Sequence, residues 1–389
     1  MRGNLDKYVV FVLSPFLSLP LILWDTLNKS KGSLVLLTIL LSLLSYLYVP
    51  GEDDDKFYYI NLYSQFRAYS LAQFLGFIFL GATDFLFYFF IYLFAQAGLP
   101  IGLLFFSMTF ITVGIAIYIF DKILSRYEMS GKRYLLFLSV FLLSYSLVNL
   151  LSGIRFYFAS SFLLLGFYSG VFKERKAISF LYFIIAAATH FSTLFYLPFY
   201  ILFLIFGKAK SVLRVLFFVS FIFIFIPGNF LIMSLDSVGV GGIYKAKAQN
   251  YLGEEKDDMT EKSIKTGNAN NTIKMVIDNI WLLVAYVFLY FKKDDGSPFK
   301  MMLLVVLALN HLFFLAPDAF FRYSIISKLF LLMMLVSVEW KVKTPKYTYV
   351  FLLLFGMSFL FNLIALRTRL IDSFSDPRSY SLVTLFLEE

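Results

Sequence analysis

Residues 101–120 read IGLLFFSMTFITVGIAIYIF, a run that contains no charged side chain. A helix needs about 20 apolar residues to cross the hydrocarbon core of a bilayer, and this run has that length. Similar Leu-, Ile- and Phe-rich runs recur along the chain, whereas a membrane β-barrel would show alternating segments of about ten residues. The sequence therefore predicts an all-α protein that crosses the membrane many times.

The composition of the whole chain supports this class. Of its 389 residues, 60% are hydrophobic and 15% are charged, whereas a soluble domain is roughly 45–50% apolar and about 25% charged. The absence of cysteine excludes disulfides and thiolate metal sites. In a membrane protein the net charge of +9 mainly reflects loops that face anionic lipid, so we expect no nucleic-acid partner.

The apolar runs predict a bundle of 11–14 transmembrane helices that forms a single transmembrane domain over residues 1–389. Four runs, 66–81, 84–97, 177–190 and 191–207, are short enough to be re-entrant segments or half-helices. The full set of predicted spans is 9–24, 33–49, 66–81, 84–97, 101–120, 134–151, 156–172, 177–190, 191–207, 211–233, 273–291, 299–316, 322–340 and 347–364.

Lys and Arg residues in the short loops predict the orientation, because cytoplasmic loops carry an excess of both. One set of loops holds 18 basic residues against nine in the opposite segments; this set is 25–32, 121–133, 173–176, 207–214, 292–300 and 341–346. If this set is cytoplasmic, both termini face outward. The acidic stretch GEDDDKFYY (51–59) and a large periplasmic or extracellular loop, 234–272, then lie on the same outer side.

His190 lies in AAATHFSTLFYLP (186–198), an apolar segment interrupted by Thr and Ser. An ionisable group in such a segment is costly and is by default a candidate functional residue. Imidazole suits proton transfer near neutral pH, so His190 is the candidate general base. The alternative is a packing histidine bonded to a backbone carbonyl that a helix break leaves open. His311, which lies within another span, is expected to be structural.

Five cations are placed at or below the outer membrane surface by this orientation: Arg155, Arg322, Lys328, Arg367 and Arg369. Arg155 follows a Ser-Gly break between two apolar runs, and Lys328 lies about 9 Å deeper than Arg322 along a helix. Cations entering the membrane from outside indicate an anionic ligand. Two alternatives remain open: Arg155 anchors the chain at lipid headgroups, or Lys328 pairs with a carboxylate such as Asp84.

The acidic stretch continues into a tyrosine-rich segment that is a candidate sugar-binding surface: Asp55, Tyr58, Tyr59 and Tyr63. Tyrosine rings with hydroxyl tips suit sugars and membrane anchoring equally well. Adjacent carboxylates can bind hard cations, but the stretch lacks the spacing of a calcium loop, so we expect a solvated face and no metal. The chain has no nucleotide-binding motif and no metalloprotease motif, and we expect no cofactor.

The order of these features resembles the EpsG/Wzy-type polysaccharide polymerases. The resemblance rests on GIRFYFA (153–159), the basic turn KERK (173–176), AAATHFSTLFYLP, an Arg-Tyr pair that opens a late span, and a tail that contains Arg, Pro and Tyr. In that family the Arg is typically followed by Gln, whereas Phe156 stands here. The resemblance implies a bundle similar to C-type glycosyltransferases that joins oligosaccharide repeat units carried on undecaprenyl pyrophosphate, at the outer face of the bacterial inner membrane.

The resemblance also implies roles for the candidate residues. His190 would take the proton of the attacking sugar hydroxyl, and the five cations would bind pyrophosphate. The implied partners are undecaprenyl-pyrophosphate-linked glycans and membrane lipid, with a chain-length regulator and a flippase as further candidates. Four alternatives remain: an O-antigen ligase, a membrane acyltransferase acting on sugars, a flippase of lipid-linked oligosaccharide, and a scaffold without catalysis. A transporter would favour charges near the midplane and an internal repeat, which the sequence does not show.

Overall fold

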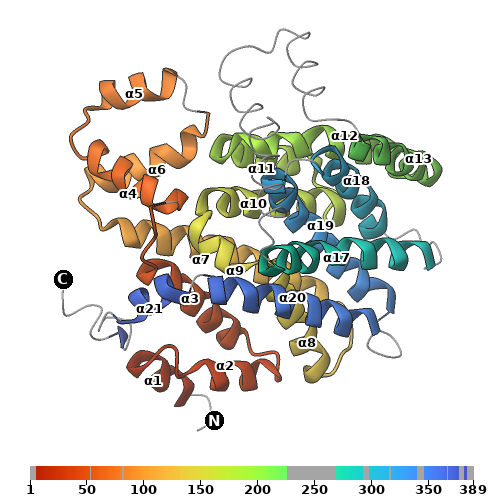
Figure 1. Cartoon of the computed structure of the whole chain (residues 1–389), viewed down its shortest axis with the longest axis horizontal. Coiled ribbons are helices and arrows are strands. Elements are labelled where there is room, and N and C mark those ends of the chain that lie inside the picture. Colours follow the sequence, from red (N-terminus) through yellow and green to blue (C-terminus); the bar gives the residue numbers. More distant parts are fainter. Residues whose placement is uncertain are drawn as a thin grey trace. The chain divides into compact units, whose positions relative to one another are not determined.

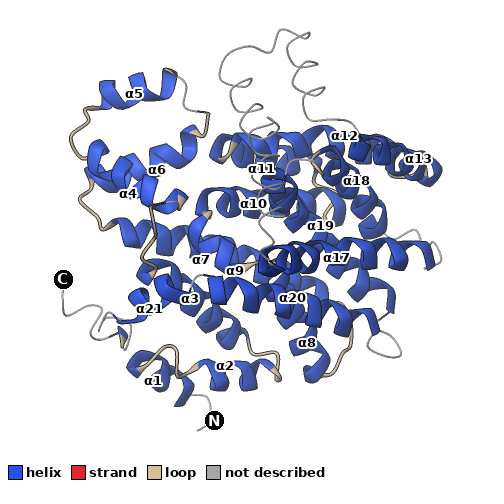
Figure 2. Ribbon diagram, in the orientation of Figure 1, coloured by secondary structure: helices blue, strands red, loops and turns tan. Residues whose placement is uncertain are grey.

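The computed structural model describes residues 6–52, 54–80, 83–225, 269–291, 298–314, 317–339, 346–365, 367–375 and 381–382. Every regular element in these ranges is a helix, and Figure 2 shows no strand among them. The all-α prediction is therefore confirmed. Most of the predicted loop 234–272 lies outside the described residues, while its last four residues already belong to helix α17 (Ala269–Phe291).

The chain divides into two compact units. Unit 1 comprises Met1–Leu142, Ser146–Leu194 and Asn362–Glu389, and unit 2 comprises Leu143–Tyr145 and Phe195–Phe361. The single domain expected over residues 1–389 stays a prediction.

Figure 1 labels the helices of both units. Unit 1 holds α1 (Asp6–Leu13), α2 (Leu19–Thr26), α3 (Lys31–Leu47), α4 (Asp55–Phe66), α5 (Leu71–Phe79), α6 (Phe85–Gln96), α7 (Ile101–Leu124), most of α8 (Gly131–Ser144), α9 (Leu147–Ser152), α10 (Ile154–Phe167), the π-helical turn η2 (Tyr168–Phe172), α11 (Lys176–Thr189), most of the 3₁₀ turn η3 (Phe191–Phe195) and α21 (Arg367–Ser375). Unit 2 holds α12 (Tyr196–Phe206), α13 (Lys210–Ser220), η4 (Phe221–Phe225), α17, α18 (Pro298–Leu312), α19 (Pro317–Glu339) and most of α20 (Lys346–Ala365).

Four helical segments of the described chain are long and apolar enough to cross a membrane: Ile101–Leu124, Ile154–Phe172, Ala319–Val336 and Lys346–Ile364. Six further apolar helices have 10–17 residues. The membrane class is thus confirmed, whereas the number of 11–14 spans stays a prediction. Some predicted spans are shorter as helices because local signals end them: the run 66–81 yields only α5, which begins after a capping box formed by Ser70 and Gln73.

The predicted span 134–151 is broken into α8 and α9. The break occurs at Ser146, whose φ of 51° lies in the left-handed region that a helix interior does not use. The predicted span 9–24 is likewise divided into α1 and α2, with Pro15 in the gap and Pro20 in the first turn of α2. Proline fits that first turn but interrupts a helix that would run through it.

An antiparallel hairpin of α10 and α11 positions the candidate site in unit 1. The two helices pack closely at Gly166, because a Cβ there would lie 3.0 Å from the ring of Phe183, and Ser179 Oγ donates a hydrogen bond to the Gly166 carbonyl at 2.7 Å. Since the chain reverses through η2 and the KERK turn, the start of α10 and the end of α11 lie at the same end of the hairpin. This brings Arg155 close to His190 although the two residues are 35 positions apart in the sequence.

Basic loops lie together at the opposite end of the α10–α11 hairpin. The guanidinium of Arg126 lies 5.3 Å from the ring centroid of Phe172, beside the KERK turn. Lys31 bonds Asp121, and the Cα of Gly131 lies against the Leu27 carbonyl so closely that a Cβ would clash. Three loops that the sequence predicts to be cytoplasmic, 25–32, 121–133 and 173–176, therefore share one end of unit 1. The predicted orientation requires this grouping.

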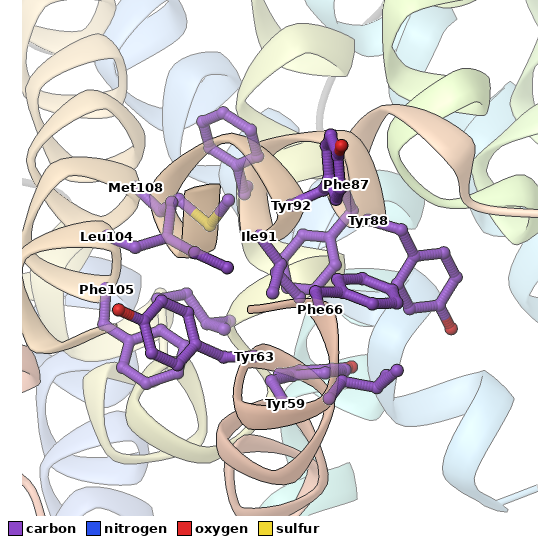
Figure 3. Packing of buried hydrophobic residues seen from close by; sticks show 14 of the residues in the cluster. Tyr59, Tyr63, Phe66, Phe87, Tyr88, Ile91, Tyr92, Leu104, Phe105 and Met108 are labelled. Atoms are coloured by element: carbon purple, nitrogen blue, oxygen red, sulfur yellow. The ribbon is translucent and has the colours of Figure 1, made fainter. Parts of the chain in front are cut away.

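An aromatic cluster takes most of its side chains from α4, α5, α6 and α7 (Figure 3). Tyr59 meets the ring of Phe87 edge to face at 4.7 Å, and Phe74 stacks on Tyr92 at 4.2 Å. Such pairs contribute about 0.5–1.5 kcal/mol each beyond the burial of their area. The cluster gives the short helices α4, α5 and α6 a packed core, and it fixes the start of α6.

Candidate functional site

A buried carboxylate, Asp84, lies between Arg155 and His190. Asp84 directly precedes α6 and is 1% exposed. Its Oδ2 accepts a hydrogen bond from Arg155 Nη1 at 2.7 Å and lies 3.2 Å from His190 Nδ1. Its Oδ1 accepts the backbone N–H of Phe191 at 2.7 Å. These donors favour the ionised form of the carboxyl group, because each hydrogen bond is made to its charge.

His190 owes its position to the end of α11. Its backbone is extended, with φ −153° and ψ 109°, so the helix stops at Thr189. The His190 N–H still donates to the Ala186 carbonyl at 2.8 Å, and the His190 carbonyl accepts from both the N–H and the hydroxyl of Thr193. Local bonds from Thr and Ser side chains compete with the helix in this way. The imidazole is thereby turned toward Asp84 and meets Phe156 edge to face at 5.8 Å.

Arg155 is held from two sides. Besides Asp84, its Nη1 contacts the Tyr88 hydroxyl at 3.3 Å, and the guanidinium lies 5.6 Å from the ring centroid of Tyr59. The side chain is 18% exposed. A guanidinium bonded to a buried carboxylate differs from an anchor that extends to lipid headgroups. Among the described residues, Nη1 is the atom of this guanidinium that makes hydrogen bonds.

The three tyrosines of the tyrosine-rich segment differ in how far they are buried. Tyr58 is 51% exposed, whereas Tyr59 and Tyr63 belong to the aromatic cluster, and the Tyr63 hydroxyl donates to the Leu99 carbonyl at 2.6 Å. Asp55 lies in the first turn of α4. The structure therefore presents only Tyr58 of these three rings at the surface, and the sugar-binding role of the set stays a prediction.

Lys56, in the same acidic stretch, is buried. Its ammonium donates to the carbonyl of Ser45, near the end of α3, and lies 4.4 Å from the ring centroid of Phe105. Burial lowers the pKa of Lys56 to about 7, although the charge of Asp54 raises it. The carbonyl and ring contacts indicate that this lysine joins α4 to α3 and α7.

Two of the predicted cations, Arg322 and Lys328, lie on α19 in unit 2. The Lys328 ammonium is surrounded by the rings of Trp281, Phe321 and Phe355, at 5.3, 5.3 and 5.7 Å from their centroids. The described contacts of the Asp84 oxygens are with Arg155, His190 and the Phe191 N–H, and the pairing of Lys328 with a carboxylate such as Asp84 stays a prediction. Meeting of the unit 2 cations with His190 stays a prediction.

The remaining predicted cations, Arg367 and Arg369, lie on α21. The Arg367 side chain is exposed, and the Arg369 side chain is outside the described part of the structure. The helix is attached to the chain just after the C-terminal end of α3, because the Val49 N–H donates to Ser373 Oγ at 2.8 Å. Arg367 therefore belongs to the end of unit 1 that is opposite the basic loops.

The second histidine, His311, has a structural environment in unit 2. It is fully buried, its Nδ1 lies 2.6 Å from Ser220 Oγ, and its Nε2 bonds the Tyr286 hydroxyl. The ring of Phe221 packs at 4.3 Å. These contacts agree with the structural role expected for His311.

Asp84 is the residue of this site that the sequence analysis did not assign to it. Its signal was present: Asp84 is the only charged residue in FIFLGATDFLFYFF (77–90). An isolated carboxylate between apolar runs needs a partner. Sequence alone did not identify that partner, which lies 71 positions away at Arg155 and 106 positions away at His190. The described residues contain no group of three or more His, Asp or Glu side chains placed to bind a metal.

A model described as the EpsG family matches residues 10–374 of the chain. This range includes Asp84, Arg155 and His190, both units and all five predicted cations. No curated protein and no solved structure matches the chain.

Proposed function

Because this chain belongs to the EpsG family of Wzy-type polysaccharide polymerases, we propose that it joins undecaprenyl-pyrophosphate-linked oligosaccharide repeat units into a surface polysaccharide. The observation that carries the proposal is the contact of one buried carboxylate with both His190 and Arg155. The proposed reaction requires a base for the attacking hydroxyl and a cationic group that binds the pyrophosphate, and His190 and Arg155 have these chemical properties.

The reaction joins two lipid-linked substrates. A hydroxyl oxygen of one repeat unit attacks the anomeric carbon of the other and forms the new glycosidic bond. The bond from that carbon to the pyrophosphate oxygen breaks, and undecaprenyl pyrophosphate leaves with the electron pair. The proton of the attacking hydroxyl goes to His190. A positioned base of this kind contributes about 10²–10⁴-fold to a rate.

Arg155 has the chemistry to stabilise the leaving group. Negative charge on the pyrophosphate increases as the bond breaks, and a guanidinium can offer two parallel N–H donors to phosphate oxygens. One nitrogen of Arg155 is held by Asp84 and Tyr88. A donor fixed in this way needs little reorganisation during the reaction. Arg322, Lys328, Arg367 and Arg369 remain proposed further contacts to the two pyrophosphates.

We place the reaction at the outer face of the bacterial inner membrane. Within unit 1 the site lies at the end of the α10–α11 hairpin opposite the loops 121–133 and 173–176, which carry most of this unit's basic loop residues. The positive-inside rule puts those loops in the cytoplasm. Enzyme fusions that work only in the periplasm should be active when inserted in loop 234–272 and inactive in the KERK turn. The reverse pattern would reject both the orientation and the outer-face reaction.

Purified protein supplied with one lipid-linked repeat unit tests the function. We expect a ladder of products that differ by one repeat unit, separated by electrophoresis or mass spectrometry, with release of undecaprenyl pyrophosphate. A ligase would leave the repeat unit unjoined until a lipid A core acceptor is added. A flippase would move the substrate across a vesicle membrane and form no glycosidic bond. Either of these two results would contradict the proposal that the protein is a polymerase.

A further inference from the structure

Asp84 contacts both residues that the proposed reaction uses, and its contacts assign it a role of its own. An ionised carboxylate offers only acceptor oxygens. The 3.2 Å contact from Oδ2 to His190 Nδ1 is therefore a hydrogen bond only when Nδ1 carries the hydrogen. A neutral imidazole with hydrogen on Nδ1 has its lone pair on Nε2.

We propose that Asp84 is a positioning residue that fixes the tautomer of His190, with hydrogen on Nδ1, so that Nε2 is the atom that accepts a proton. The catalytic consequence rests on the proposed function, whereas the tautomer itself does not. Aspartate holds the catalytic histidine of serine proteases in the same manner, on unrelated folds.

The carboxylate is well placed for this task because its own position is fixed. Oδ1 is bound by the Phe191 N–H, and Thr83 Oγ1 lies 3.3 Å from the same oxygen. Asp84 also directly precedes α6, whose Phe87 and Tyr88 lie in the aromatic cluster. The carboxylate thus joins the start of α6 to the end of α11, and it sets the distance between Oδ2 and the imidazole.

Arg155 completes the arrangement. Its Nη1 shares Oδ2 with His190 and brings a permanent positive charge within 2.7 Å of the carboxylate. A buried carboxylate needs such a partner to stay ionised. Because Arg155 supplies it, Asp84 can remain an anion next to an imidazole that is neutral and able to act as a base.

Asp84→Asn should reverse the tautomer. The Phe191 N–H requires the amide oxygen at the position of Oδ1, so the amide nitrogen replaces Oδ2. That nitrogen can only donate. His190 can then bond it only through a lone pair on Nδ1, and the hydrogen moves to Nε2.

Nitrogen-15 NMR of histidine-labelled protein measures the tautomer directly. The chain has only two histidines, so a His311→Gln sample assigns the signals. In alkaline buffer we expect wild-type His190 with hydrogen on Nδ1 and none on Nε2, and the reverse in Asp84→Asn. The matched control is Asp121→Asn, because Asp121 is also buried and charge-paired in unit 1 but lies at the opposite end, bonded to Lys31 and Tyr134. It should leave His190 unchanged.

The outcomes separate this inference from the proposed function. A wild-type His190 with hydrogen on Nε2 would overturn the inference. This measurement uses the wild-type protein alone and does not depend on whether a variant folds. An Asp84→Asn variant that keeps hydrogen on Nδ1 would also overturn it. If the tautomer reverses and turnover falls by about 10²-fold or more, both proposals are supported. If the tautomer reverses while turnover is unchanged, Asp84 positions His190 as proposed, and His190 is not the base.

Discussion

Replacing His190 with Gln is expected to lower polymerisation turnover by about 10²-fold or more while the protein stays folded. Glutamine approximates the size of histidine and can still donate a hydrogen bond to Asp84, but it does not accept a proton near neutral pH. The loss is therefore expected in the rate constant and not in the binding of lipid-linked substrate. Initial rates with a defined repeat unit, together with thermal unfolding in detergent, measure the two effects separately.

The pH dependence provides a second measurement of the same prediction. The wild-type rate should fall in acidic buffer as the imidazole takes up a proton and ceases to be a base. The His190→Gln variant should lack this acidic limb. His311→Gln is the matched control, because it removes the other histidine from a buried structural network. It should change stability and leave the turnover of folded protein near that of the wild type. A His190→Gln enzyme with near wild-type turnover would show that another group activates the hydroxyl.

Arg155→Lys should reduce turnover by about 10²-fold, to within about tenfold of Arg155→Ala. Lysine keeps the charge and can bond Asp84, but a single ammonium does not offer the parallel donors of a guanidinium to Asp84, Tyr88 and a phosphate together. Removal of one fixed donor from a site of developing charge typically costs about 10²–10³-fold. Single-turnover rates and the affinity for undecaprenyl pyrophosphate report the two parts of this loss.

Stability has to be measured alongside the arginine variants. Arg155→Ala leaves the buried Asp84 without its cation, and breaking a buried pair destabilises a protein by about 3–5 kcal/mol. The lysine variant is therefore the more informative of the two. Arg126→Lys is the control, because Arg126 also packs on an aromatic ring, at the opposite end of unit 1. If Arg155→Lys makes polymer of normal amount and length, Arg155 serves the packing of Asp84 and does not bind pyrophosphate.

The elements of the fold that depend on local composition were predicted correctly. Long uncharged runs such as 101–120 specify a membrane helix, because hydrocarbon excludes every structure that leaves backbone groups unbonded. The boundaries were less accurate where a few local bonds decide them. The capping box at Ser70 and the left-handed Ser146 shortened or divided runs that hydrophobicity alone made continuous.

Sequence by itself determined the membrane class, identified Arg155 and His190 as candidate site residues of unit 1, and indicated a resemblance to the family that the chain matches. Only the tertiary structure decided that both residues contact Asp84, because their closeness depends on the reversal between α10 and α11. The position of Asp84 between them was decided in the same way. A lone carboxylate in an apolar run indicates that a partner is needed, but which residue is the partner depends on which helix ends pack together. That packing depends on close contacts such as the one between Gly166, which has no side chain, and the ring of Phe183 across the hairpin.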